Sequence, residues 1–161
     1  MSERMAWAAI AALSGEDPVG ISQPERSRLR NRLAHLREDD NPAALLSSWM
    51  PRRGDRRRFS APSPDALDFV RDDPRIALSG ISDPRSGISG GSVVEGWVRK
   101  PEDIDDLIAD HLLLPNIAGH VVLHVGRNID GPVPIGLVMA DLADWNGPRE
   151  DGEVTRLVTR T

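Results

Sequence analysis

The residues best suited to chemistry in this chain are arginines that gather in one stretch of the N-terminal third. Residues 21–60 contain ten arginines, no lysine and five acidic residues, which gives this stretch a local charge of +5. Guanidinium groups at such density suit contact with the phosphates of a polyanion. Codon bias is an alternative origin, because nineteen of the twenty basic residues in the chain are arginine. Codon bias does not explain the clustering, so nucleic-acid contact is the favoured interpretation.

The rest of the chain is acidic. Residues 61–161 carry nine basic and seventeen acidic residues, a balance of −8, and the whole chain has a formal charge of −5. One predicted helix concentrates these acids. Successive helix positions do not converge on one point, so a docking surface for a basic partner or a solvated face is favoured over a metal or catalytic site. The residues predicted to bind a partner are Glu102, Asp103, Asp106 and Asp110, with Asp105 on the same face.

Two histidines raise the question of a metal site. His120 and His124 are four residues apart and would share one face of a strand. Two neutral ligands without a cysteine or a third nearby histidine make a poor zinc set, and the chain has no cysteine. We interpret both as half-buried strand histidines and expect no metal and no cofactor. No Ser/His/Asp set is recognisable by its spacing, so an enzyme is not expected, and a nuclease or hydrolase that uses the acids of 102–110 ranks last.

Three helices are predicted to position the arginines. The first covers Met5–Leu13, the second begins at a capping box that starts at Ser22, and the third runs from Pro42 to Met50. At helical spacing, Leu29, Leu33 and Leu36 form an apolar stripe with arginines on both sides. Gly54-Asp55 predicts a tight turn between two very short strands.

Three helices followed by a basic turn are the layout of a winged helix-turn-helix, in which the third helix enters the major groove and the wing touches backbone. The third helix has no Arg, Lys or Gln, so we do not expect it to read base sequence by itself. The predicted DNA contacts are Arg26, Arg30, Arg37, Asn41, Ser47, Ser48, Arg52, Arg53, Arg56, Arg57 and Arg58.

The second half of the chain predicts a mixture of strands and helices. A fourth helix opens at Ser63-Pro64 and ends before Pro74. The following elements are expected to be strands at 75–79, 92–99 and 120–125 and helices at 101–112, 135–145 and after Gly147-Pro148. On the helix that begins at Pro101, the expected apolar face is Ile104, Leu107, Ile108 and Leu112. We therefore predict an α+β protein with a winged-helix-like head at 1–60, a connecting helix at 61–73 and an α/β body at 74–161.

The body resembles the C-terminal part of the AbiEi-type antitoxins and transcriptional regulators of actinobacteria. The resemblance covers roughly half of the chain, from Asp73 to Glu150. It is carried by the order and spacing of short strings, which include 73–80 (DPRIALSG), 94–98 (VEGWV), 107–115 (LIADHLLLP), 121–125 (VVLHV), 139–142 (MADL) and 147–150 (GPRE). The resemblance implies an N-terminal winged helix that represses its own promoter. It also implies a C-terminal α/β domain that helps to counter a nucleotidyltransferase toxin encoded next door.

Two functions follow as expectations. The first is a cytoplasmic DNA-binding regulator that acts as the antitoxin of a nucleotidyltransferase-type toxin, with double-stranded DNA and the toxin as partners and a homodimer as a possible state. The alternative is a protein-interaction module that binds a partner protein without specific DNA reading. No apolar run approaches the roughly 20 residues of a membrane span, so no membrane partner is expected.

Overall fold

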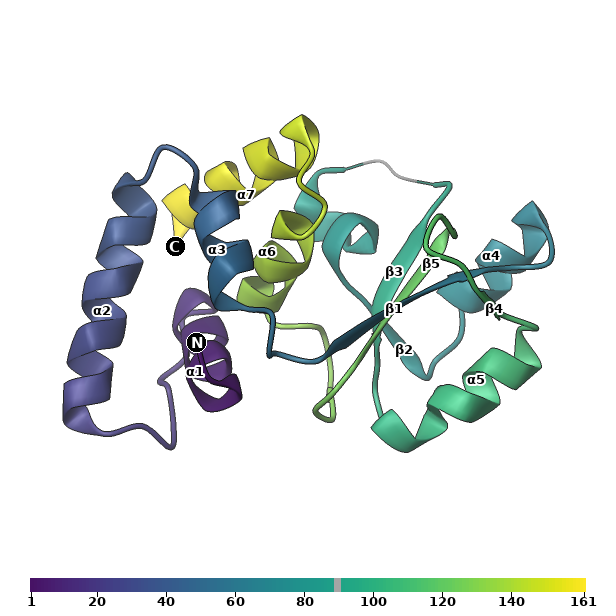
Figure 1. The fold of residues 1–161 in the computed structure, drawn as a ribbon, viewed down its shortest axis with the longest axis horizontal. Coiled ribbons are helices and arrows are strands. Elements are labelled where there is room, and N and C mark those ends of the chain that lie inside the picture. Colours follow the sequence, from purple (N-terminus) through teal and green to yellow (C-terminus); the bar gives the residue numbers. More distant parts are fainter. Residues whose placement is uncertain (89–90) are drawn as a thin grey trace. The chain divides into compact units, whose positions relative to one another are not determined.

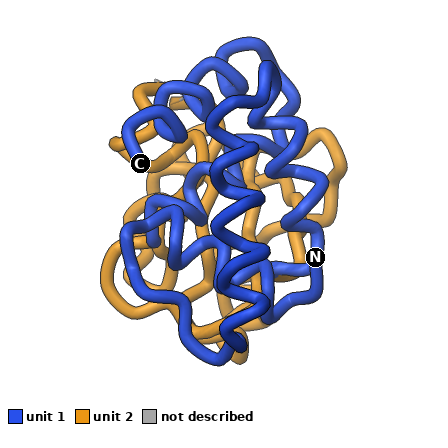
Figure 2. The backbone as a smooth tube through the Cα atoms, turned by 90° about the vertical axis from the view of Figure 1, so that its left-hand side faces the viewer, with its two compact units in different colours: residues 1–53, 134–161 blue, residues 54–133 orange. Residues whose placement is uncertain are grey.

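The computed structural model describes residues 1–88 and 91–161, and these divide into two compact units. Residues 1–53 and 134–161 form the helical unit, and residues 54–133 form the sheet unit (Figures 1 and 2). The predicted α+β class is confirmed, because helices accompany a mixed five-stranded sheet. The observed boundaries at 53 and 133 differ from those expected at 60 and 74, because the last two helices belong with the first three.

The helical unit is built around its fourth helix. It contains α1 (Glu3–Leu13), α2 (Gln23–Glu38), α3 (Pro42–Trp49), α6 (Ile135–Ala143) and α7 (Pro148–Arg160). Helix α6 is apolar on nearly all sides and packs against α1, α3 and α7, as expected for a helix at the centre of a core. Gly136 allows its close approach to α1, since a Cβ at this position would collide with the backbone oxygen of Ile10.

Helix α2 forms as its sequence predicts. The hydroxyl of Ser22 accepts a hydrogen bond from the backbone N–H of Glu25, and the Glu25 carboxylate accepts one from the backbone N–H of Ser22 at 2.8 Å. The predicted capping box is therefore present. The predicted apolar stripe is also confirmed, because Leu29, Leu33 and Leu36 are the buried residues of this helix.

The sheet unit contains a five-stranded sheet in the order β2-β3-β5-β1-β4. Its strands are β1 (Asp55–Ser60), β2 (Ile76–Leu78), β3 (Val94–Val98), β4 (Leu114–Pro115) and β5 (Val121–Val125). Strands β3 and β5 run parallel, and the other neighbouring pairs are antiparallel. Strands were predicted at the places of β2, β3 and β5, and two very short strands were expected on either side of Gly54-Asp55, where β1 lies; β4 was not predicted.

The predicted wing is wrong. Residues 55–60 form one continuous strand, which pairs with β5 from Asp55 opposite Val125 to Phe59 opposite Val121. No turn joins two short strands at Gly54-Asp55. The reason is tertiary: the ladder with β5 and the burial of Phe59 in the core outweigh the weak strand preference of three successive arginines.

One face of the sheet carries the core of this unit. Helices α4 (Pro64–Arg71) and α5 (Ile104–Asp110) contribute to it, and short 3-10 turns lie at Gly80–Ser82, Pro84–Ser86 and Pro101–Asp103. The core cluster comprises Phe59, Leu67, Val70, Ile76, Val94, Val98, Ile104, Leu107, Leu113, Val121 and Leu123. Leu112 was expected on the same apolar face, but it lies beyond the end of α5 and is exposed. In the part of the chain that the structure describes, no helix has both the length and the apolar character needed to cross a membrane.

Candidate interaction surfaces

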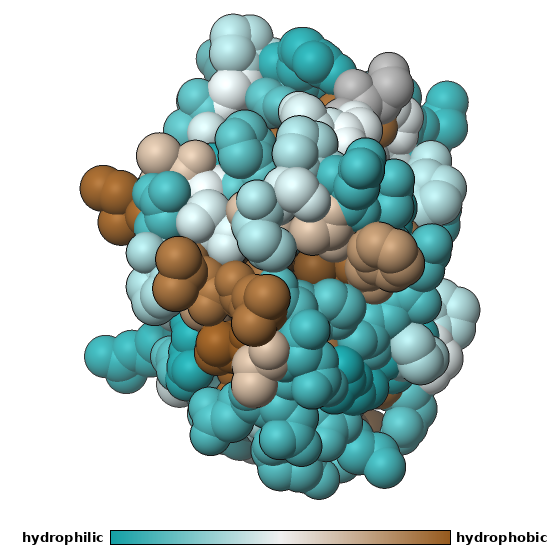
Figure 3. Space-filling model, turned by 90° about the vertical axis from the view of Figure 1, so that its right-hand side faces the viewer, coloured by the Kyte–Doolittle hydropathy of each residue, from teal (hydrophilic) through white to brown (hydrophobic). Residues whose placement is uncertain are grey.

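An apolar surface lies on the sheet unit, directly after α5. Leu112, Leu114 and Ile117 are 69%, 67% and 93% exposed, and all three lie within one stretch of six residues. Figure 3, which faces the α4, α5 and β4 side of Figure 1, shows apolar side chains gathered on this face. We call these three residues the apolar surface. Exposed apolar residues that gather in this way mark sites of protein interaction more often than singly scattered ones do.

Backbone hydrogen bonds hold the apolar surface in place. The N–H of Leu112 donates to Ala109, and the N–H of Leu113 donates to Ile108, which closes the end of α5. Leu113 is buried beneath the surface, and the N–H of Asn116 donates to the oxygen of Arg58 on β1. The exposed leucines therefore belong to ordered backbone that is tied to the helix at one end and to the sheet at the other.

Leu112 itself has an unusual backbone. Its φ is +52°, in the left-handed region where glycine usually ends a helix. A bulky residue in this conformation costs free energy on the order of 1 kcal/mol or more. The chain therefore keeps a large apolar side chain exposed at a position where glycine would fit with less strain.

Acidic residues of α5 and of the 3-10 turn just before it adjoin this segment in sequence, and we call them together the acidic face of α5. The side chains of Glu102, Asp105 and Asp106 are exposed, and among the residues that the structure describes no basic group lies within ion-pair distance of them. Asp103 is half-buried at the start of the helix. Asp110 is different, because Arg75 donates a hydrogen bond to it at 2.9 Å. Of the four predicted partner-binding acids, Asp110 is therefore the one already neutralised within the sheet unit.

Asp73 and Arg75 anchor the end of α5. The guanidinium of Arg75 donates to the Asp73 carboxylate at 3.0 and 2.7 Å, and the backbone N–H of Arg75 donates to it at 2.9 Å. His111, the C-cap of α5, lies 2.7 Å from the same carboxylate. Hydrogen bonds from Arg75 hold the pKa of Asp73 well below its usual range, against the opposing effect of burial. This network fixes the direction in which the chain leaves α5, and so the place of Leu112.

The arginines of α2 remain available to a ligand. Arg28, Arg30, Arg32 and Arg37 are exposed, and none has a carboxylate within ion-pair distance in residues 1–88 and 91–161. Arg26 is half-buried and lies 3.4 Å from Asp17. Two of the three α2 arginines predicted to contact DNA, Arg30 and Arg37, thus lie on an unneutralised basic face.

The polar side chains at the start of α3 and along it are engaged in hydrogen bonds within the helical unit. Asn41 caps the helix by accepting a hydrogen bond from the N–H of Ala44. Ser47 donates to Asp144 at 3.1 Å, and Ser48 donates to the oxygen of Leu45 at 2.7 Å. These bonds give each of the three side chains a structural role, so the helix offers little with which to read bases.

The basic residues after α3 have separate positions. Arg53 is buried in the helical unit, where it binds Asp141 and Asp144, so it cannot contact phosphate. Arg52 is exposed just before it. Arg56, Arg57 and Arg58 lie on β1, and Arg58 donates to the oxygen of Gly119 at 2.6 Å. The structure does not bring these arginines together as a wing.

A buried acid–histidine pair was not predicted. On the sheet face opposite the core cluster, Nε2 of His124 lies 2.9 Å from the Glu95 carboxylate, and the ring of Trp97 stacks on His124. The backbone N–H of Ile81 donates to the same carboxylate at 3.1 Å. His120 is exposed and His124 is fully buried, so our interpretation of both as half-buried is wrong.

No family model matches this chain, and no curated protein or solved structure matches it. The function must therefore be inferred from these surfaces.

Proposed function

We propose that the protein is an interaction module, whose sheet unit binds a basic partner protein through the apolar surface and the acidic face of α5. The observation that carries this proposal is the exposure of Leu112, Leu114 and Ile117 on a segment that backbone hydrogen bonds join to α5 and to β1. Apolar side chains supply the buried centre of most interfaces, and charges around them speed encounter and reject wrong partners.

The resemblance to AbiEi-type antitoxins supplies a partner of the right chemistry. A nucleotidyltransferase-type toxin handles nucleotides or RNA, so it must carry a basic cleft, and an acidic helix complements such a cleft. Under this proposal the protein acts in the cytoplasm, where such a toxin would act.

Replacing Leu112 with glycine should separate binding from folding. The change removes an exposed apolar anchor, so affinity for the toxin encoded by the neighbouring reading frame should fall about tenfold to a hundredfold. The free energy of unfolding should stay the same or rise by up to about 1 kcal/mol, because glycine relieves the positive φ. Biolayer interferometry and urea denaturation measure the two effects.

The matched control is Val19→Ser, which removes an exposed apolar side chain from the helical unit and should leave binding unchanged. Full affinity in the Leu112→Gly variant would contradict the proposal, as would a lack of binding by the unaltered protein.

Reversal of Glu102, Asp105 and Asp106 to lysine should slow association more than it speeds dissociation, with an effect that shrinks at high salt. Lysine at the exposed residues Glu16 and Glu38 serves as the charge control.

The second candidate is DNA binding by a regulator, and the unneutralised arginines of α2 favour it. Replacing Arg30 and Arg37 with alanine should weaken binding to every duplex alike and should make the slope of log affinity against log salt shallower by roughly 0.9 per lost contact. Because Asn41, Ser47 and Ser48 are occupied, we expect little preference for the protein's own promoter over a scrambled duplex. Gel shifts at several salt concentrations measure both quantities. Replacement of Arg160, on α7, is the control.

A further inference from the structure

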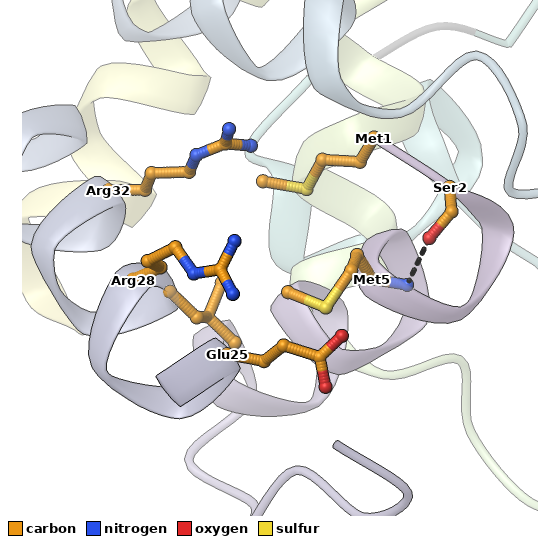
Figure 4. Close-up of a pocket in the computed structure, with 7 residues that line it drawn as sticks. Met1, Ser2, Met5, Glu25, Arg28 and Arg32 are labelled. Carbon is orange, nitrogen blue, oxygen red and sulfur yellow. Dashed lines mark hydrogen bonds between the residues drawn. The ribbon is translucent and has the colours of Figure 1, made fainter. Parts of the chain in front are cut away.

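In the helical unit, helices α1 and α2 leave a hollow between them. Its volume is about 210 Å³, and residues at the start of α1 face residues on the first three turns of α2 across it. Figure 4 shows Arg28 and Arg32 reaching from α2 towards Met1 and Met5. The hollow therefore has one apolar wall and one cationic wall.

The apolar wall is suited to an unbranched or irregular apolar group. It is formed by Met1 and Met5, and the buried Leu29 adds apolar surface from α2, between Arg28 and Arg32. Methionine side chains are flexible and polarizable, so they adjust to ligands of different shapes. At about 210 Å³ the hollow is smaller than the roughly 300 to 1,000 Å³ of a drug-sized ligand pocket, which favours a small ligand with a short chain of heavy atoms.

The cationic wall lacks an internal counter-ion. Arg28 and Arg32 stand one helical turn apart, and within the described chain neither has a carboxylate at ion-pair distance. The acid that lines the hollow, Glu25, is already engaged by Arg4 and by the N–H of Ser22. The hydrogen bond from Arg4, supported by that from Ser22, lowers the pKa of Glu25 to about 2, so Glu25 remains a committed carboxylate at ordinary pH.

A neighbouring hollow differs in that one of its arginines has a counter-ion within the protein. On the other side of Leu29, a second hollow of about 220 Å³ is lined by Arg26, Arg30 and Asp17. There Arg26 lies 3.4 Å from the Asp17 carboxylate, so the protein supplies an anion of its own. The hollow with Arg28 and Arg32 has two arginines and an apolar wall, and its acid is used elsewhere.

We propose that this hollow binds a small organic acid, with one carboxylate held by Arg28 and Arg32 and a short apolar body against Met1, Met5 and Leu29. Two guanidiniums one turn apart can donate to the same carboxylate, and such charge-assisted hydrogen bonds are the strong ones. Its residues belong to the helical unit, whereas those of the proposed docking surface belong to the sheet unit.

Octanoate is the probe, and the four methionines of the chain report its position. In protein labelled with ¹³C at the methionine methyl groups, octanoate should shift the signals of Met1 and Met5 saturably, with a Kd of about 1 mM. The signals of Met50 and Met139 should not move, because both side chains are fully buried. Replacing Arg28 and Arg32 with glutamine should weaken binding at least about tenfold.

The control variant has the same net charge as the Arg28/Arg32 variant. Glutamine at Arg149 and Arg160, both exposed on α7, removes two charges from the helical unit outside this hollow and should change the Kd by less than about twofold. Equal binding of octanol or octylamine would overturn the proposal, because recognition would not depend on the carboxylate. Inorganic phosphate that shifts the same methyl signals at equal concentration would overturn it as well, because the apolar wall would then contribute nothing. Unchanged octanoate affinity in the Arg28/Arg32 variant would have the same consequence.

Discussion

Replacing Arg53 with alanine is expected to lower the free energy of unfolding by about 3 to 5 kcal/mol. The Arg53 side chain is 4% exposed and donates hydrogen bonds to Asp141, which is fully buried, at 3.0 and 2.8 Å. It also binds Asp144 and donates to the backbone oxygen of Met50. Burial would by itself lower the pKa of this guanidinium, but the two carboxylates reverse that effect and raise it.

The large loss follows from what remains after the substitution. Asp141 would stay buried without the Arg53 cation, and removing one member of a buried ion pair costs far more than removing one member of a surface pair. Urea denaturation followed by circular dichroism measures the change. Arg52→Ala, one residue earlier and exposed, should alter stability by no more than about 0.5 kcal/mol. A loss below about 1 kcal/mol for Arg53→Ala would show that Asp141 finds another way to be satisfied.

The second large effect is expected at Glu95. Its carboxylate is fully buried between the Ile81 N–H and Nε2 of His124, so Glu95→Ala leaves two polar groups without that partner. We expect a loss of about 3 kcal/mol or more, because unmade buried hydrogen bonds carry the full cost of desolvation and a cavity adds to it.

Glu95→Gln is the matched variant and should cost only about 1 kcal/mol. Its carbonyl oxygen can accept from Ile81, and its amide can donate to His124 in the other tautomer of the ring. Thermal and urea unfolding of both variants measure the difference. Equal losses for alanine and glutamine would show that the negative charge matters and the hydrogen bonds do not.

Local patterns in the sequence predicted most helices because each helix carries its own signals. The capping box at Ser22, the leucine stripe of α2 and the Pro-initiated helices are all determined within a few residues. Strands β3 and β5 could be predicted equally well, since their apolar runs are short and bounded by turn residues. These elements form where the sequence places them.

The features that were not predicted from the sequence depend on contacts between residues far apart in the chain. The segment 55–58 (DRRR) has no strand pattern, and only its ladder with β5 makes it a strand. Arg52 and Arg53 are indistinguishable as neighbours, yet one is exposed and the other meets an acid 88 residues later. The return of α6 and α7 to the first three helices leaves no local trace, so the expected boundaries were misplaced.

The candidate site was predicted in part for the same reason. The acids of α5 were assigned to a docking face, and the structure leaves Glu102, Asp105 and Asp106 without basic partners in its described part. The apolar surface was missed, because Leu112 fits the helical spacing of Ile104 and Ile108 and was assigned to the core. Only the positive φ of Leu112, which ends the helix, turns that side chain outward.

The division of the helical unit between 1–53 and 134–161 has a consequence for synthesis on the ribosome. The first three helices emerge before α6, the helix on which α1 and α3 pack. Their apolar faces therefore wait while residues 54–133 are translated, roughly 4 to 16 s at about 5 to 20 residues per second. The stretch of chain for the sheet unit is complete by then. In the nascent chain, the arginine-rich part is thus the last to gain its native core.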